Sequence, residues 1–348
     1  GTGKCNCTVC WKQRMWTIGV TPADFRLLSG EDQLADYGRS GDWGARLLMT
    51  IDGYRVNDGV YDQALPQHEF PIVADWVKRA ELIYGPASSV YGSNALIGVA
   101  NIVTLDGADA PGLRVRAAAL PRGGTRLGAS YGRRDGATDL FIGAARHLLP
   151  GETLTLPELA APNLPDGRIA GLDGLAYSSL FAKLRHGPWR ATFGLQSRDK
   201  SVATAAYGTA PGVPGTRYED YYGWGELAYE GEWQGDWRTQ ARASLSAVGF
   251  EGRYRYAAPA GSGWLDNIDR ASARWLSLDA RAHWRGWLNH QWLFGAELRH
   301  LPKVAQSNFN VEPPVVNLDI AHASTQLGLY LQDHWRLDER TSLTLGLR

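Results

Sequence analysis

Few residues of this chain form a pattern that is typical of chemistry. Cys5, Cys7 and Cys10 make a C-x-C-x-x-C cluster, and cysteine thiolates at such spacing are candidate metal ligands. A zinc site needs a second group of ligands, and the chain has no other cysteine. We therefore expect no metal site here. Residues 1–19 are left as an unassigned N-terminal segment, because their composition does not match the rest.

A second candidate is a serine nucleophile. Residues 128–132, GASYG, match the G-x-S-x-G pattern, which requires a strand, a sharp turn and a helix. Here the pentapeptide lies inside alternating sequence that has Leu127, Ala129 and Tyr131 on one face and Ser130 on the other. The eight histidines form no H-E-x-x-H motif, and no glycine-rich phosphate loop is present. We expect no catalytic residues and no cofactor, so the sequence does not predict an enzyme.

A polar cluster of Asp62, His68 and Glu69 is the remaining candidate site. It lies in a segment of mixed polarity, residues 61–69, which also contains Tyr61 and Gln63. Contact with a ligand and simple exposure to solvent both account for such a cluster, so both stay open.

Composition points to an all-β protein. The 348 residues include 41 Gly, 14 Trp and 15 Tyr, which favours strands joined by many turns. The formal charge is zero, so no nucleic-acid surface is expected. No run of about 18 apolar residues predicts a transmembrane helix. Membrane β-barrels are not excluded, since their strands give only a weak alternating signal.

The region 45–105 predicts short mixed elements. Strands are expected at 45–51, 80–84 and 99–104. The apolar spacing in 72–79 fits one or two turns of helix, and 88–94 predicts another helical turn. Together they predict a small α+β unit.

From about residue 113 the pattern changes to apolar–polar alternation. We expect eleven strands, at 113–119, 125–133, 138–147, 177–186, 189–199, 219–231, 238–254, 273–285, 290–301, 324–336 and 341–348. Short connections alternate with longer ones, and the long loops are expected at 148–176, 200–218, 255–272 and 302–323. Short turns on one rim and long loops on the other are typical of an outer-membrane barrel.

Tryptophan placement favours the same interpretation. Seven tryptophans stand beside predicted short turns, where an aromatic girdle would meet the membrane interface: Trp189, Trp233, Trp237, Trp284, Trp287, Trp292 and Trp335. A soluble β-sandwich or β-propeller is the alternative on alternation alone. Because single-chain bacterial barrels close with an even number of strands, eleven strands suggest a chain cut at its C-terminal end.

Two motifs in residues 52–104 carry a resemblance to a known family. The first is Asp52, Gly53, Arg55, Val56, Asn57 and Asp58, which match the D-G-x-R-V-N-D part of an L-I-D-G-x-R-V-N-D pattern. The second comprises Gly85, Pro86, Ser88, Tyr91, Gly92, Ser93, Asn94, Ala95, Gly98, Val99, Asn101, Ile102 and Thr104. Together they resemble the plug domain of TonB-dependent outer-membrane receptors. Tyr84 and Ala80 depart from the family pattern, in which an arginine and an unbroken E-R-(I/V)-E-V segment are usual.

The resemblance implies a plug at 20–107 followed by part of an antiparallel up-and-down barrel at 108–348. Eleven strands would be half of the about 22 in this class of transporter. Neither a signal peptide nor the TonB box, which engages TonB, is found in the chain. The plug-motif residues are expected to serve structure: glycines for sharp turns, and Ser88, Ser93 and Asn94 to satisfy backbone amides.

The resemblance also implies a function. We expect a monomer in the outer membrane of a Gram-negative bacterium that contacts lipid, TonB and a small-molecule or metal-chelate ligand. It would import a scarce nutrient such as a ferric siderophore, cobalamin or haem. Candidate ligand contacts are Tyr61, Asp62, Gln63, His68, Glu69, Tyr207, Tyr218, Tyr221, Tyr222, Trp264 and Asn308. A passive porin-like barrel and a soluble β-rich carbohydrate-active enzyme are the alternatives.

Overall fold

Two β-sheets make up most of the chain. The computed structural model describes residues 25–27, 47–64, 70–84, 91–92, 95, 98–160, 164–258 and 263–348. One sheet has five strands and the other has eleven, and β9 (Leu154–Thr155) pairs with β10 (Arg168–Ile169) in a separate ribbon. We call residues 25–27 and 47–110 the inner unit and the eleven-stranded sheet the wall. No helix among the described residues has the length and apolar character needed to cross a membrane.

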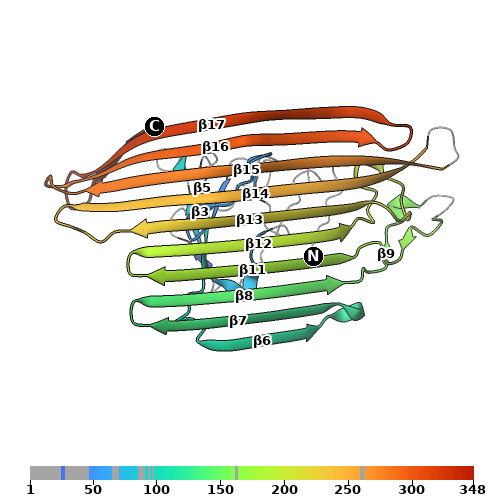
Figure 1. Cartoon of the computed structure of the whole chain (residues 1–348), viewed down its shortest axis with the longest axis horizontal. Coiled ribbons are helices and arrows are strands. Elements are labelled where there is room, and N and C mark those ends of the chain that lie inside the picture. The colour runs from blue at the N-terminus through green and yellow to red at the C-terminus, as the bar shows by residue number, and fades with distance from the viewer. Residues whose placement is uncertain are drawn as a thin grey trace.

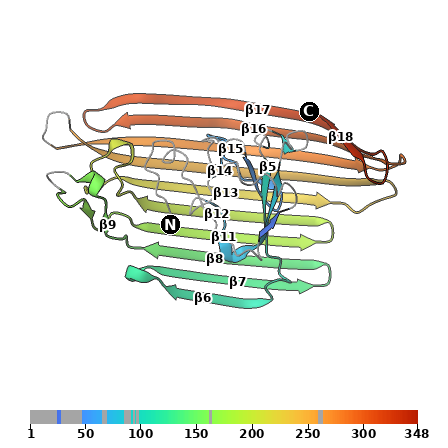
Figure 2. The ribbon, with the colours of Figure 1, turned by 180° about the vertical axis from the view of Figure 1, so that it is seen from behind.

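The inner unit is a mixed sheet with the strand order β1-β4-β5-β2-β3. Its strands are β1 (Phe25–Leu27), β2 (Leu47–Ile51), β3 (Tyr54–Arg55), β4 (Val77–Tyr84) and β5 (Gly98–Thr104). β5 pairs with β2 in parallel and with β4 in antiparallel fashion. Figure 2 shows this sheet against the face of the wall that Figure 1 turns away from the viewer.

The helix expected at 72–79 is wrong. Only Ala74–Trp76 form a single 3-10 turn, η2, and Val77 already begins β4. The apolar spacing of 72–79 fits a helix, but β4 pairs with β5 from Val77 opposite Thr104 to Tyr84 opposite Gly98, with one register shift between Val77 and Arg79. Tertiary pairing therefore overrides the local pattern. The helical turn expected at 88–94 lies largely outside the described residues.

The wall confirms the eleven predicted strands. In chain order they are β6 (Gly112–Ala119), β7 (Thr125–Asp135), β8 (Thr138–Leu149), β11 (Leu175–His186), β12 (Trp189–Ser201), β13 (Arg217–Glu230), β14 (Trp237–Ala257), β15 (Trp264–Trp284), β16 (His290–Asn310), β17 (Val315–Arg336) and β18 (Ser342–Leu347). Each is antiparallel to the next, so the sheet is an up-and-down array that runs from β6 to β17 across Figure 1. Residues 128–132 lie within β7 and pair with β8, so Ser130 is part of a ladder and not of a strand–turn–helix elbow.

Two of the four long loops are shorter than predicted. The expected loops at 255–272 and 302–323 are largely strand, because β14 to β17 run for 21, 21, 21 and 22 residues. Only 258–263 and 311–314 connect them. The loops around 150–174, with η4 (Pro157–Leu159), and around 202–216, with η5 (Ala206–Gly208), are long as predicted.

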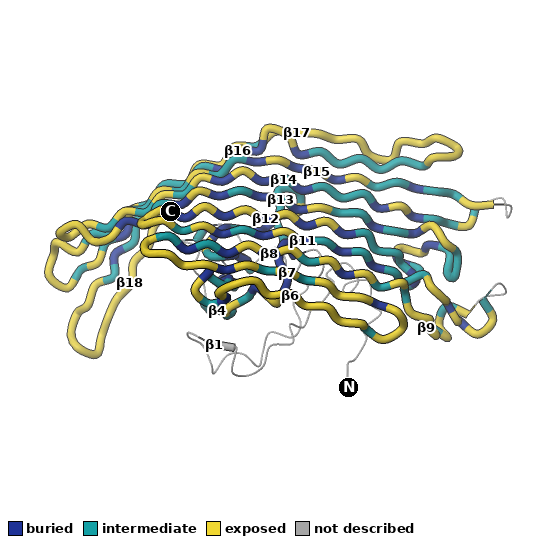
Figure 3. The backbone as a smooth tube through the Cα atoms, turned by 60° about the horizontal axis from the view of Figure 1, so that its bottom comes forward, coloured by how far each residue is buried: buried dark blue, intermediate teal, exposed yellow. Residues whose placement is uncertain are grey.

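The two faces of the wall differ as the alternation requires. Outward positions leave Leu113, Val115, Leu245, Leu327 and Leu329 between 66% and 73% exposed. Inward positions of the central strands are buried against the inner unit, and Figure 3 shows more and less exposed residues alternating along these strands. An apolar outer face on a pleated sheet is what a hydrocarbon environment selects.

The predicted tryptophan rim gathers at the short turns. Trp237 stacks on Trp284 with ring centroids 5.8 Å apart, and Trp287 meets both Trp284 and Trp292. Trp335 stacks on His290 at 5.1 Å. The turns that they flank are short, such as 187–188 and 285–289. Aromatic rings at one rim of an apolar band are typical of a membrane interface.

Candidate functional site

A tight turn fixes the inner unit to the wall. Asp52 and Gly53 both have positive φ, at 49° and 81°. The Asp52 carboxylate accepts hydrogen bonds from the Thr104 amide at 3.0 Å and hydroxyl at 2.5 Å, and Lys183 Nζ of β11 lies 3.3 Å from it. Lys183 also pairs with Asp106 at 2.8 Å and is only 4% exposed. A buried cation is therefore satisfied almost entirely by the inner unit.

Arginines of the wall complete this attachment. Arg190 donates to the carbonyl of Asp52 at 2.9 Å and pairs with Glu226 at 3.1 Å, while Arg242 reaches the same carbonyl at 3.4 Å. A side chain at position 53 would displace the guanidinium of Arg242 from this contact, since a Cβ would stand 2.4 Å from Arg242 Nη1. The glycine of the D-G motif thus allows the guanidinium to approach the turn.

Aromatic rings fill the space between the two sheets. Tyr54 stacks on Trp224 with centroids 5.5 Å apart, and its hydroxyl is 3.0 Å from that of Tyr222 and 2.5 Å from Ser246 Oγ. Burial raises the pKa of Tyr54 to about 12, so the hydroxyl stays protonated and can donate. These contacts come from β13 and β14, and Tyr222 also lines the cavity described next.

The segment 56–64 is held in one conformation by its own polar groups. Asn57 is fully buried, and its amide links the Met49 N–H with the carbonyls of Leu47 and Asp62. Asp58 Oδ1 accepts the backbone N–H groups of Val60 at 2.7 Å and Tyr61 at 2.6 Å. Burial raises the pKa of Asp58 above its ordinary value.

Arg299 of β16 clamps the same segment from the wall. Its guanidinium donates to the carbonyls of Asn57 and Asp58 at 3.3 and 3.2 Å and lies 3.3 Å from Asp62. Asp62 also pairs with Arg55 at 2.7 Å. The loop is therefore preorganised, which lowers the entropic cost of binding a ligand to it.

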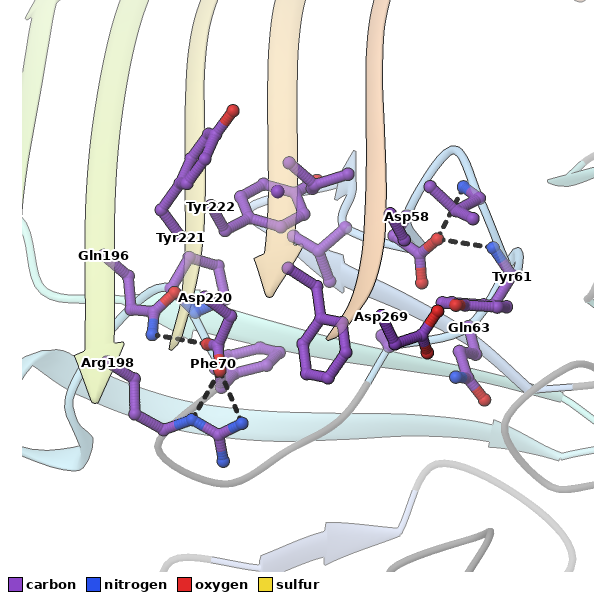
Figure 4. Close-up of a pocket in the computed structure, with 18 of the residues that line it drawn as sticks. Asp58, Tyr61, Gln63, Phe70, Gln196, Arg198, Asp220, Tyr221, Tyr222 and Asp269 are labelled. Carbon is purple, nitrogen blue, oxygen red and sulfur yellow. Dashed lines mark hydrogen bonds and ion pairs between the residues drawn. The ribbon is translucent and has the colours of Figure 1, made fainter. Parts of the chain in front are cut away.

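A cavity of about 430 Å³ lies between this segment and the wall. Its floor comes from the inner unit, with residues 56–64, Phe70 and Pro71, and its sides come from β12 to β15 and Tyr207 of the loop 202–216. Figure 4 shows Asp58, Tyr61, Gln63 and Asp269 on one side, and Gln196, Arg198 and Asp220 on the other. The size is ordinary for a small-molecule site.

Aromatic side chains of β13, β14 and the loop 202–216 lie along one part of the cavity. Tyr254 meets Tyr207 edge to face at 5.6 Å, and Tyr218 packs behind Tyr254 at 5.6 Å and Phe250 at 5.7 Å. Next to them, on β12 and β13, Arg198 is paired with Asp220 at 2.5 Å. The cavity thus combines flat apolar walls with a few fixed polar groups, which is the usual makeup of a ligand pocket.

The structure brings five of the predicted ligand contacts to the cavity: Tyr61, Gln63, Tyr207, Tyr221 and Tyr222. Of these, Tyr221 is at the edge, since its ring lies against Gly249 and is 44% exposed. Asp62 is held by the two arginines, and Tyr218 stands in a second layer behind the lining. His68 and Glu69 lie outside the described residues.

The remaining two predicted contacts lie on strands. Trp264 begins β15 and is 49% exposed, and Asn308 belongs to β16. Asn308 bonds to Asn267 at 2.8 Å and to the carboxylate of Asp269, so it touches the cavity only through Asp269. Neither residue lines the cavity among the described residues.

The plug-motif residues that the structure describes serve the inner unit itself. Asn101 accepts hydrogen bonds from Thr50 at 2.8 Å and the Gly53 amide at 3.0 Å, and donates to Glu81 at 2.9 Å. A Cβ at Gly98 would stand 2.4 Å from the Ile83 carbonyl. Gly92 has φ +78°, and Tyr91 faces Arg281 of β15 at 5.8 Å. Gly85, Pro86, Ser93 and Asn94 lie outside the described residues.

Sequence reasoning missed several residues of the cavity: Phe70, Gln196, Arg198, Asp220, Phe250, Tyr254 and Asp269. A signal existed for those on strands. Asp220 and Tyr222 occupy the same face of β13, so choosing Tyr222 implied Asp220 as well. Their meeting with the inner unit, however, is a long-range contact that alternation does not encode.

The comparison with known families agrees with this architecture. A family model described as TonB dependent receptor-like, beta-barrel matches residues 165–348. The chain belongs to the TonB-dependent receptor family. This match covers wall strands that lie outside the motifs of residues 52–104, so it supports the predicted resemblance independently.

Solved receptors of similar fold were also found. The pyoverdine outer membrane receptor of Pseudomonas aeruginosa is 12% identical, with 86% of this chain and 48% of that chain covered and a TM-score of 0.59. The siderophore receptor PiuA of Acinetobacter baumannii is 13% identical, with 86% and 49% covered and a TM-score of 0.56. The ferric enterobactin receptor of P. aeruginosa is 15% identical, with 87% and 49% covered and a TM-score of 0.56. The chain spans about half the length of these structures, and at such identity the likeness concerns the fold.

Proposed function

We propose that this protein is an outer-membrane receptor that takes up a scarce nutrient with energy delivered by TonB. In this proposal residues 20–107 act as the plug and 108–348 as part of the barrel. The family consists of outer-membrane transport receptors, and the similar solved structures are named as siderophore receptors. Ferric siderophores, cobalamin and haem are the cargo classes to test.

One observation carries the proposal: the cavity is built jointly by the inner unit and the wall. Its floor, formed by residues within 56–64 together with Phe70 and Pro71, belongs to the inner unit, whereas β12 to β15 form its sides. Any displacement of the inner unit must therefore change the shape of the pocket. A ligand that fills the pocket must in turn alter the energy of that displacement, because coupling between two sites is reciprocal.

Uptake by cells tests this proposal. Cells that express the full-length protein are given labelled ferric siderophores, cobalamin or haem, with TonB present or deleted. We expect accumulation of one cargo that stops without TonB and falls strongly when Tyr61, 47% exposed at the cavity, is changed to Ala. The control is Tyr131→Ala, since Tyr131 lies on the outward face of β7, away from the cavity, and is 39% exposed. Accumulation that continues unchanged without TonB would mean a passive barrel.

A further inference from the structure

The charges around the cavity are unbalanced. Three carboxylates line it, Asp58, Asp220 and Asp269, but Arg198 is the one cation among its described lining residues. Arg198 is 5% exposed at its side chain and is engaged by Asp220, with Nη2 2.5 Å and Nε 2.7 Å from the carboxylate. Its charge is therefore already matched within the protein.

The other two carboxylates have no cation of their own. Within the described parts of the chain, no ion pair joins Asp58 or Asp269 to a lysine, arginine or histidine. Asp58 is held by backbone amides, and Asp269 by the amide of Asn308. Tyr61 interacts electrostatically with both carboxylates, and the three residues lie on the same side of the cavity.

Aromatic rings surround the same space. Tyr61, Phe70, Tyr207, Tyr222, Phe250 and Tyr254 line the cavity, and each presents a π system that attracts a cation. Rings of this kind also provide flat apolar area for the body of a ligand. Aromatic faces beside unmatched carboxylates form the environment that stabilises an organic cation and opposes an anion.

From these features we propose that the part of the cargo that enters the cavity is a cationic group carried on an apolar or aromatic body. An anionic chelate would meet two uncompensated carboxylates and find Arg198 already occupied. The inference rests on the proposed function, because it assumes that this cavity receives the cargo, and it adds the charge class that the cavity selects.

Three probes of similar size, one cationic, one neutral and one anionic, test whether the cavity selects for positive charge. The full-length protein in nanodiscs is titrated with 2-phenylethylammonium, 2-phenylethanol and 3-phenylpropanoate, and binding is followed by saturation-transfer NMR and calorimetry. We expect the cation to bind at least about tenfold more tightly than the anion, with the alcohol between them. Raising the salt concentration is expected to reduce the difference in affinity between the cation and the anion.

Two sets of variants locate the effect. Asp58→Asn and Asp269→Asn keep the shape and the hydrogen-bond acceptors, and each is expected to lower the preference for the cation several-fold. Asp319→Asn, on β17 and outside the cavity, makes the same change in net charge and is expected to leave the preference unchanged. Tyr207→Leu keeps apolar area at a 56% exposed position. It is expected to weaken binding of 2-phenylethylammonium more than binding of 2-phenylethanol.

The outcomes separate this inference from the proposed function. Equal or stronger binding of 3-phenylpropanoate, absence of binding by the cation, or a preference that survives both Asp→Asn changes would overturn the charge class. None of these readouts depends on TonB. A receptor that prefers the cation but accumulates no cargo would contradict only the proposed uptake, and one that imports an anionic cargo through this cavity would contradict only the present inference.

Discussion

At the scale of single residues, polar atoms buried between the two sheets decide how firmly the inner unit is held. Lys183 has partners in Asp52, Asp106 and Thr104, all in the inner unit, although it belongs to the wall itself. Removing one partner from a buried charge pair leaves the other desolvated and unmatched, which costs more than the pair contributes.

We therefore expect Lys183→Met to destabilise the protein by about 3–5 kcal/mol, because the carboxylates of Asp52 and Asp106 lose their buried cation. The control is Lys78→Met, since Lys78 forms a partly exposed pair with Asp109 at 2.7 Å and is expected to cost less than about 1 kcal/mol. Urea-induced unfolding in detergent measures both free energies. Equal losses in the two variants would show that the buried pair has no special weight.

Asp58 gives a prediction about pH. Burial raises its pKa in the folded state, so the folded protein holds this proton at pH values where the unfolded chain, with a pKa of about 3.9, has released it. Stability from this group is thus present below the ordinary pKa and is lost as pH rises through the raised one. Asp58→Asn keeps an acceptor for the Val60 and Tyr61 amides and has no such proton.

The free energy of unfolding of wild type relative to Asp58→Asn is therefore expected to fall as pH rises from about 4 and to level off above the raised pKa. Chemical unfolding across a pH series measures this difference. Parallel curves for the two proteins would mean that burial does not raise the pKa of Asp58.

At the scale of elements, apolar–polar alternation predicts the wall strands where one face of the strand is apolar. It fails at strand ends where neither face of the strand is apolar. The ends of β15 and β16 beyond the apolar band carry Asn267, Asp269, Asn308 and Asn310, and a bulge at Leu301/Val304 interrupts the period at Pro302. Backbone pairing continues there although the pattern has gone, so the sequence suggested loops. Likewise β4 is defined by its partner β5 and not by its own spacing.

Glycines that permit close contact between strands give a prediction at this scale. Gly98→Ala places a Cβ 2.4 Å from the Ile83 carbonyl of β4, so we expect a loss of about 1–3 kcal/mol from overpacking. Gly225→Ala on β13 is the control, because nothing lies within 4 Å of its Cβ. That change is expected to be neutral or to stabilise by up to about 1 kcal/mol. Thermal unfolding of both variants decides whether the contact at Gly98 is as tight as described.

At the scale of the whole molecule, the motifs of residues 52–104 predict the family, and the alternation from residue 113 onward predicts an outer-membrane barrel. The cavity was only partly foreseen. The sequence predicts Tyr61 and Tyr222 as ligand contacts, whereas Phe70, Tyr254 and Asp269 line the cavity with them because the inner unit lies against β12 to β15. Such contacts between distant segments depend on docking geometry, which no local pattern records.

The apolar outer face gives a prediction for the membrane. Leu245→Arg places a charge at an outward position of β14 that is 66% exposed, and we expect about 2–4 kcal/mol of destabilisation in lipid if it lies near the bilayer centre. Leu288→Arg is the control, since Leu288 is 88% exposed but lies in the turn 285–289. Folding yields in bilayers measure both effects, and equal tolerance of the two arginines would argue against a lipid-facing wall.

The stack of Tyr54 on Trp224 has a practical consequence. The two rings lie 5.5 Å apart and nearly parallel, one from each sheet, and Trp224 is only 2% exposed. Departure of the inner unit would replace the tyrosine ring with water and move the emission of that indole to longer wavelength. In a variant that keeps Trp224 as its only tryptophan, the wavelength of fluorescence emission would thus report whether the inner unit is in place against the wall.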